Sequence, residues 1–176
     1  MKAFLLFTLS FIMLAKAGAQ PLADVARYLQ NPKIYEPARQ IYNEERKAAA
    51  DSITARVADS MLTRNSVTRP FYLLVVSRMF IYADAGLATM LYSRCDKVLE
   101  KYPNELVEFL YCNNNMVHSD FKNYWASAIV GYIGKTHRDD AQAWFGKLRE
   151  QLMKTCKKNN RTDLTAFLDT IASGLQ

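Results

Sequence analysis

The feature that most constrains this chain is an apolar run at residues 71–82, Phe-Tyr-Leu-Leu-Val-Val-Ser-Arg-Met-Phe-Ile-Tyr, which follows Pro70. Ten of its twelve residues are apolar or aromatic, and only Ser77 and Arg78 interrupt it. The run would also suit a buried strand, but a lone strand cannot satisfy its backbone, and no second segment of comparable strength follows. We therefore expect a helix that is buried on most sides, with the other helices packed around it.

The first nineteen residues have the pattern of a cleaved secretory signal peptide (1–19). Lys2 precedes a twelve-residue apolar stretch, and the small residues Ala-Gly-Ala at 17–19 predict cleavage before Gln20. Cleavage after Ala17 is the alternative. The apolar stretch is shorter than the roughly 20 residues of a membrane-spanning helix, which argues against a retained anchor. We expect an exported protein, periplasmic or extracellular, with no stable membrane insertion after signal cleavage.

The rest of the chain is predicted to be all-α. Residues 20–36 contain two prolines and are expected to form a leader or linker, with at most a short helix. Residues 37–176 are expected to form a single helical domain, because apolar residues recur there at helical spacing. The segment 37–64 fits either one helix or two helices separated near Asp51. Taken together, the pattern predicts a compact bundle of about six helices after the signal peptide.

The charge of the chain argues against one class of partner. Lysine and arginine total 23 against 17 acidic residues, which gives a formal net charge of +6. The basic residues are scattered, and no long block of like charges occurs. Nucleic-acid binding usually needs a basic patch or stripe, so we expect no nucleic-acid partner.

The three cysteines are Cys95, Cys112 and Cys156. An odd number in an exported protein permits one intramolecular disulfide and leaves one spare thiol. If Pro103 marks a turn between two antiparallel helices, Cys95 and Cys112 lie at similar heights on neighbouring helices, and a disulfide between them is possible. The alternative is that all three are small, buried, reduced side chains.

A repeated His-x-Asp pattern occurs at His118-Ser-Asp120 and at His137-Arg-Asp139. An imidazole beside a carboxylate can bind a metal ion or act as a general base. The two motifs flank a predicted helix at 120–133, and its rise places them roughly 20 Å apart, too far to share an ion. We interpret the aspartates as residues that open helices. We predict no metal site.

Arg78 is a candidate binding residue because it is a lone charge in the most apolar predicted helix. An arginine there can bind a carboxylate or phosphate at the floor of a cleft. It can also serve the structure alone, by reaching water or by pairing with an acid such as Asp84 or Glu100. The sequence favours the second interpretation, because buried charges are usually paired.

His118, Tyr124 and Trp125 are the other candidate binding residues. The adjacent Tyr124 and Trp125 cannot share one helix face, so we expect this pair, with Tyr132, to contribute to the surface. Aromatic residues at helical spacing also serve as core filler, which is the more common role.

The sequence carries no recognisable catalytic motif: no nucleophile elbow, His-Glu-x-x-His, Walker loop, dinucleotide fingerprint or Cys-x-x-Cys. We therefore expect no catalytic residues and no cofactor. The leading hypothesis is an exported, non-catalytic helical protein that binds another protein, as an accessory, inhibitor or immunity-type module. Two alternatives are kept open. One is a helical-bundle carrier of an apolar ligand, and the other is a small hydrolase that uses His118 or His137.

Overall fold

A computed structural model describes residues 25–111 and 117–176. These residues form nine α-helices, three short 3-10 helices and no strand, which confirms the all-α class but exceeds the six helices predicted. The α-helices are α1 (Val25–Leu29), α2 (Glu36–Tyr42), α3 (Ser52–Asp59), α4 (Arg69–Met79), α5 (Ala85–Lys101), α6 (Pro103–Leu110), α7 (Phe121–Thr136), α8 (Ala141–Thr155) and α9 (Arg161–Gly174). The 3-10 helices are η1 (Ser60–Leu62), η2 (Phe80–Tyr82) and η3 (Lys158–Asn160). The predicted signal peptide at 1–19 and Cys112 lie outside the described residues.

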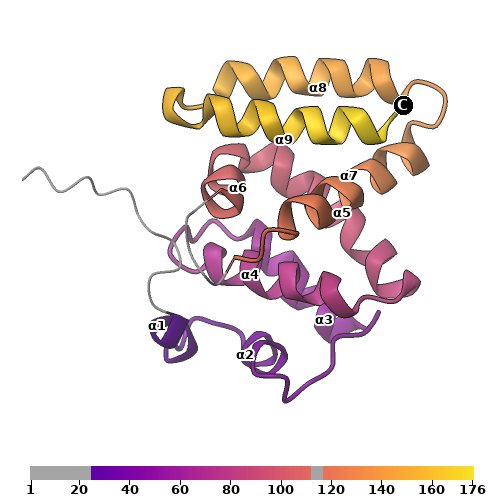
Figure 1. The fold of residues 1–176 in the computed structure, drawn as a ribbon. Helices are drawn as coiled ribbons and strands as arrows, with labels where there is room; N and C mark the ends of the chain where they lie inside the picture. The colour runs from indigo at the N-terminus through magenta and orange to yellow at the C-terminus, as the bar shows by residue number, and fades with distance from the viewer. Residues whose placement is uncertain (1–24, 112–116) are drawn as a thin grey trace, which may run out of the picture.

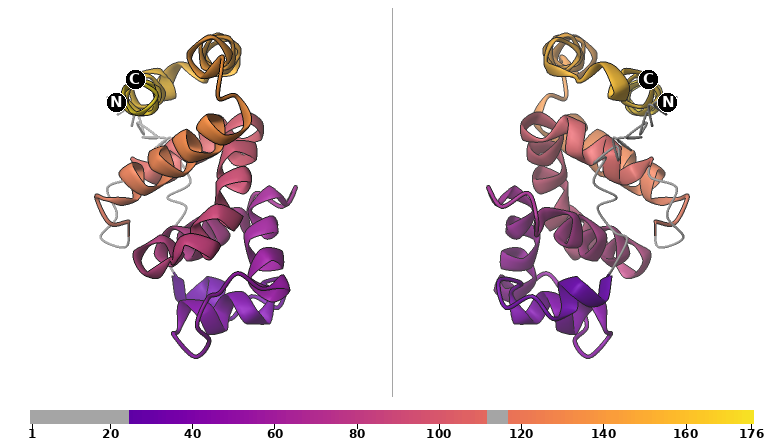
Figure 2. Two further views of the ribbon diagram at one scale, coloured as in Figure 1. Left: turned by 90° about the vertical axis from the view of Figure 1, so that its right-hand side faces the viewer. Right: turned by 90° about the vertical axis from the view of Figure 1, so that its left-hand side faces the viewer.

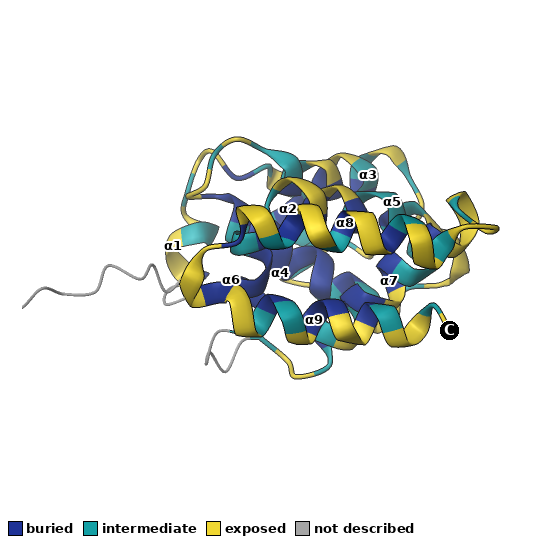
Figure 3. Ribbon diagram, turned by 90° about the horizontal axis from the view of Figure 1, so that it is seen from above, coloured by how far each residue is buried: buried dark blue, intermediate teal, exposed yellow. Residues whose placement is uncertain are grey.

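The helices lie in three tiers (Figure 1). Helices α1 to α3 form one end of the molecule, α4 to α7 form the middle, and α8 and α9 lie side by side across the other end. Figure 2 shows α8 and α9 nearly end-on, which places them beyond the middle tier in both side views. Viewed from the α8 and α9 side, the outward faces of these helices are exposed while α4 beneath them is buried (Figure 3).

The predicted central helix is α4, and the strand alternative is wrong. Pro70 stands in its first turn, where the missing N–H costs no hydrogen bond. Nine of its eleven residues are buried, so it has no solvent-facing stripe. A helix that is apolar on nearly every side must be surrounded by others, and α4 contacts α2, α3, α6 and α7.

The segment 37–64 contains two helices, which was one of the two alternatives predicted. Helix α2 ends at Tyr42, and α3 begins only at Ser52. Asp51 caps α3, because its Oδ1 accepts a hydrogen bond of 2.7 Å from the backbone N–H of Thr54. Residues 43–51 form the loop between these two helices.

The described part of the predicted leader packs against the domain. Ile34 is buried, and the backbone N–H of Tyr35 donates a hydrogen bond of 3.0 Å to the hydroxyl of Tyr72 in α4. The ring of Tyr28 in α1 stacks on Phe71 with centroids 5.6 Å apart. Aromatic contacts of this kind add to the free energy of burial, so residues 25–36 belong to the same core as α4.

Candidate functional site

Arg78 lies in the last turn of α4 and points toward the loop after α2. Its Nη2 is 3.1 Å from Glu44 Oε1, and its guanidinium carbon is 4.6 Å from the ring centroid of Tyr42. Of the two structural interpretations, reaching water or pairing with an acid, the structure shows a pair. Its acid is Glu44 and neither of the acids that we named, Asp84 and Glu100, because the break between α2 and α3 brings residue 44 to the end of α4.

Glu44 has a left-handed backbone, with φ of 64°, and it is the one non-glycine residue with positive φ in the described ranges. It follows the C-cap Asn43, and the N–H of Glu45 bonds back to the carbonyl of Gln40 at 2.9 Å. This is the bonding pattern of a Schellman motif, whose left-handed position usually holds glycine. A non-glycine residue there costs about 1–2 kcal/mol. Despite this cost, residue 44 is a glutamate, and its carboxylate lies beside Arg78.

A groove opens between this loop and the end of α4, with a volume of about 480 Å³. Its lining combines apolar and charged side chains: Ile41, Glu44, Arg46, Lys47, Ala48, Arg78, Met79 and Tyr82. We call this set the α2–α3 groove. Three of the lining residues are cationic and one is anionic, so the groove favours a negatively charged group.

Arg46 lines the α2–α3 groove, and one nitrogen of its guanidinium has no hydrogen-bond acceptor in the described structure. Its Nη2 is 2.9 Å from Asp51 Oδ2, so one part of the guanidinium is held in place. Its Nε is buried and has no hydrogen-bond partner in the described structure. The backbone bond from Thr54 and the neighbouring Arg46 keep the pKa of Asp51 below its ordinary value.

Two exposed apolar side chains lie next to the α2–α3 groove. Ile81 and Tyr82 of η2 are 45% and 66% exposed, and Tyr82 itself lines the groove. Exposed large apolar side chains beside a concave surface mark binding faces more often than scattered ones do. We call the α2–α3 groove together with Ile81 the groove face.

No protein-family model, curated protein or solved structure matches this chain. Among residues 25–111 and 117–176, no helix has both the length and the apolar character needed to cross a bilayer. The function therefore has to be inferred from the groove face itself.

The other predicted binding residues are not among those that line the groove. Trp125 is fully buried, so the expectation that it belongs to the surface is wrong. Tyr124 is half-buried, and its ring stacks on Phe80 with centroids 6.3 Å apart. His118 is exposed just before α7 and lies 3.3 Å from Asp120. Tertiary packing therefore leaves Arg78 as the predicted residue that lines a concave site.

The two His-x-Asp motifs stay apart, at opposite ends of α7. His137 stacks on Trp144 at 4.3 Å and lies 3.7 Å from Asp140 rather than beside Asp139. The capping interpretation is only partly right. Asp120 is the N-cap residue of α7, but α8 has Asp140 at its N-cap, not the predicted Asp139, and neither N-cap side chain makes a capping hydrogen bond. No cluster of three or more metal-ligating side chains occurs in the described part of the chain.

Cys95 and Cys156 are buried. Burial raises the pKa of both thiols, most strongly that of Cys95, so neither has the character of a reactive thiolate. The predicted disulfide joins Cys95 to Cys112. It stays a prediction, because Cys112 lies outside the described residues.

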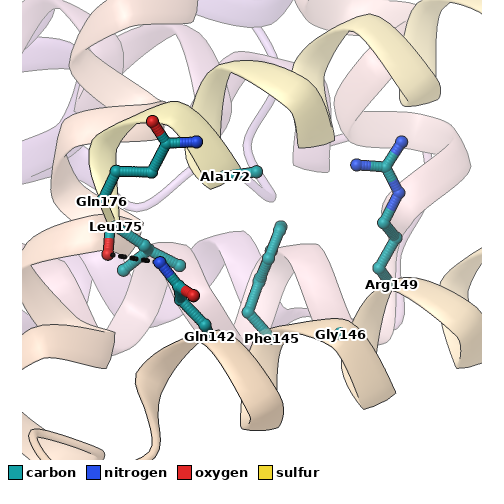
Figure 4. A pocket seen from close by; sticks show the side chains of 7 residues that line it. All are labelled: Gln142, Phe145, Gly146, Arg149, Ala172, Leu175 and Gln176. Carbon is teal, nitrogen blue, oxygen red and sulfur yellow. Dashed lines mark hydrogen bonds between the residues drawn. The ribbon is translucent and has the colours of Figure 1, made fainter.

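A second cavity, of about 310 Å³, lies between α8 and α9 near the end of the chain (Figure 4). Phe145 points from α8 toward α9, and the side chain of Gln142 donates a hydrogen bond to the carbonyl of Leu175 at 3.5 Å. Arg149, on the same wall, is 2.7 Å from Asp169. Gln142 and Arg149 are thus engaged within the protein. The α2–α3 groove is larger and has the exposed Tyr82 in its lining, which makes it the stronger candidate.

The sequence analysis did not single out the loop residues Glu44, Arg46 and Lys47, because it left open whether 37–64 is one helix or two. The usable signal was the charged run at 44–47, between two apolar periodic segments. A run of that kind fits an inter-helix loop as well as a solvated helix face.

Proposed function

We propose that this chain is an exported, non-catalytic protein that binds another protein through the groove face. The observation that carries the proposal is the position of Ile81 and Tyr82, which lie exposed beside a groove of about 480 Å³ that also contains Arg78. Tyrosine and arginine are enriched in the cores of protein interfaces, and Tyr82 and Arg78 occur together here.

The composition of the groove favours binding over catalysis. Its lining supplies cations, a carboxylate, a phenol and apolar surface. The histidines, which the hydrolase alternative would use, lie at the two ends of α7 and are not part of the lining. Side chains of this kind suit recognition of an apolar and charged surface.

A photo-crosslinking experiment tests the proposal. Benzoylphenylalanine replaces Tyr82 in one variant and Gln151, an exposed residue on α8, in a matched control. Irradiation of producing cells should give a discrete cross-linked protein from position 82 and not from position 151. The partner identified by mass spectrometry should then bind the purified protein, and the substitution Tyr82→Asp should weaken that binding at least tenfold.

The control for Tyr82→Asp is Val67→Asp. Val67 is 62% exposed but precedes α4, at the opposite end of that helix from Tyr82. It should leave partner binding unchanged. Equal cross-linking from positions 82 and 151, or equal losses from the two aspartate variants, would contradict a role for the groove face.

Export is a separate part of the proposal. It rests on the sequence of residues 1–19. Amino-terminal sequencing of the protein recovered from the periplasm or culture medium should begin at Gln20. An intact amino terminus on protein found only in the cytoplasm would contradict it.

The carrier of an apolar ligand is the second candidate, and the groove volume favours it. Sites for small molecules commonly span roughly 300–1,000 Å³, and this groove falls within that range. Native mass spectrometry of the purified protein distinguishes the two candidates. A co-purifying small molecule that is lost in the variant Met79→Ala would favour the carrier.

A further inference from the structure

We propose that the α2–α3 groove recognises an acidic residue flanked by apolar side chains on the partner protein, and that Glu44 occupies the position of that acid in the free protein. The proposal rests on the proposed function, because it names what the groove face binds. The occupant is a segment of a partner protein, and the argument for it is charge complementarity.

The charges of the groove are arranged to receive a carboxylate. Arg78 already binds one, that of Glu44, through a contact of 3.1 Å. Arg46 also lines the groove and already holds a carboxylate, that of Asp51, at 2.9 Å. Lys47 also lines the groove and forms no ion pair with any residue in the described part of the chain. Arginine binds carboxylates through charge-assisted hydrogen bonds, so an incoming acid finds several donors at one place.

Glu44 is suited to leave this position when a partner arrives. Its side chain is 67% exposed, and exposed ion pairs contribute little to stability, so exchanging its carboxylate for another costs little. Its left-handed backbone marks a position where the C-terminal motif of α2 would favour glycine. The end of α2 therefore gives no reason for a glutamate at residue 44, whereas the contact of that glutamate with Arg78 in the groove does.

The apolar part of the groove selects what surrounds the acid. Ile41 and Ala48 are partly buried apolar residues that line it beside the cations. Tyr82, which also lines it, is 66% exposed, and the neighbouring Ile81 is 45% exposed. Apolar side chains on both sides of a partner's Asp or Glu would cover these residues. A peptide that is only acidic would leave them exposed to water.

Selection of peptides from a random phage-displayed library tests the proposal without a known partner. The target is the protein as it is recovered after export. Selected peptides should carry Asp or Glu next to apolar or aromatic residues. A fluorescein-labelled copy of the strongest peptide then serves as the probe in anisotropy titrations.

Three variants test the roles of Arg78 and Glu44. Arg78→Met should weaken probe binding at least tenfold. Glu44→Gln and Glu44→Gly, which remove the competing carboxylate, should strengthen it severalfold. The matched control is Arg94→Met, because Arg94 forms a comparable ion pair with Asp59, 2.8 Å away, outside the groove. It should leave the dissociation constant unchanged. Circular dichroism confirms that each variant is folded.

The outcomes separate this proposal from the proposed function. If selected peptides lack acidic residues, or if Arg78→Met and Arg94→Met act alike while Tyr82→Asp abolishes binding, the acid-recognition proposal is wrong and the binding face stands. If neither Arg78→Met nor Tyr82→Asp affects the probe, or if no peptide is enriched, both are wrong. A gain of affinity in Glu44→Gln, with a loss in Arg78→Met, supports both.

Discussion

Trp125 and Ser77 are joined by a buried hydrogen bond in which the indole Nε1–H donates to the hydroxyl Oγ at 2.8 Å. Ser77 in turn donates to the carbonyl of Leu73 at 2.8 Å. Neither Trp125 nor Ser77 is exposed to solvent. The bond ties α7 to α4 and explains why a hydroxyl interrupts the most apolar helix of the chain.

The substitution Ser77→Ala should lower the free energy of unfolding by about 1–3 kcal/mol. The reason is that the indole N–H of Trp125 would be left buried without an acceptor. Urea unfolding followed by circular dichroism measures the loss. Ser173→Ala is the matched control, since Ser173 bonds the carbonyl of Asp169 on an exposed helix face, and it should change stability by less than about 0.5 kcal/mol.

A double-mutant cycle with Trp125→Phe isolates the pair. Phenylalanine removes the donor, so Ser77→Ala should cost less in the Trp125→Phe background than in the wild-type protein. The coupling energy between contacting residues is typically about 0.5–3 kcal/mol. Strictly additive losses would show that the hydrogen bond contributes nothing.

Arg69 and Arg78 should differ sharply in their contribution to stability. Arg69 is 2% exposed, pairs with Glu105, donates to the carbonyl of Thr63 and stacks on the Tyr102 ring at 3.5 Å. Arg69→Met breaks this buried arrangement and should cost about 3 kcal/mol. Arg78→Met removes only a partly exposed pair and should cost less than about 1 kcal/mol.

Thermal and urea unfolding of these two arginine variants provide the comparison. A loss in Arg78→Met as large as that in Arg69→Met would assign Arg78 a structural role and weaken the case for the α2–α3 groove. The sequence drew attention to Arg78 alone, whereas packing makes Arg69 the buried one.

Asp96 should make stability depend on pH. Burial, with a smaller contribution from Glu100, raises the pKa of this carboxyl from 3.8 to about 7, and its Oδ1 has no hydrogen-bond partner in the described structure. Between about pH 4 and pH 7 the folded protein therefore binds more protons than the unfolded chain. Through Asp96, stability should fall as the pH rises through this window and level off above it.

The substitution Asp96→Asn tests this dependence. The amide cannot ionise, so the variant should exceed the wild-type protein in stability at pH 8, by up to about 4 kcal/mol at about 1.4 kcal/mol per pKa unit. The difference should shrink toward pH 4. Asp59→Asn is the control, because Asp59 is exposed and paired with Arg94, and it should give no gain at pH 8. A constant difference between pH 4 and pH 8 would contradict the assignment.

Two glycines in α7 should respond oppositely to alanine. A Cβ at Gly131 would lie 2.6 Å from a ring carbon of Tyr92 in α5, whereas a Cβ at Gly134 would meet nothing within 4 Å. Gly134→Ala should therefore raise stability by about 0.5–1 kcal/mol, which is the helix preference of alanine over glycine. Gly131→Ala should lower it, because the ring must move from the α5–α7 contact. Melting temperatures that shift in the same direction would contradict the close approach.

Local patterns in the sequence were sufficient for the helical class and for the central helix. Ten apolar residues in twelve, after Pro70, can satisfy their backbone and their burial together only as a helix inside other helices. The helix count was underestimated because α1 and α2 are only five and seven residues long, too short for periodicity to define. Helices of this length depend on tertiary contacts, such as the stacking of Tyr28 on Phe71.

The sequence by itself determined that α4 is buried and that Arg78 needs a partner or an exit to water. Only the tertiary structure decided which partner it has, because Glu44 is 34 residues away in the chain. It likewise decided that Trp125 is core, since adjacent aromatics must face different sides of a helix and periodicity does not say which side is covered. The α2–α3 groove was also decided by the tertiary structure. Its walls are the loop after α2 and the end of α4, and packing brings these two segments together. Periodicity along either segment does not predict that they meet.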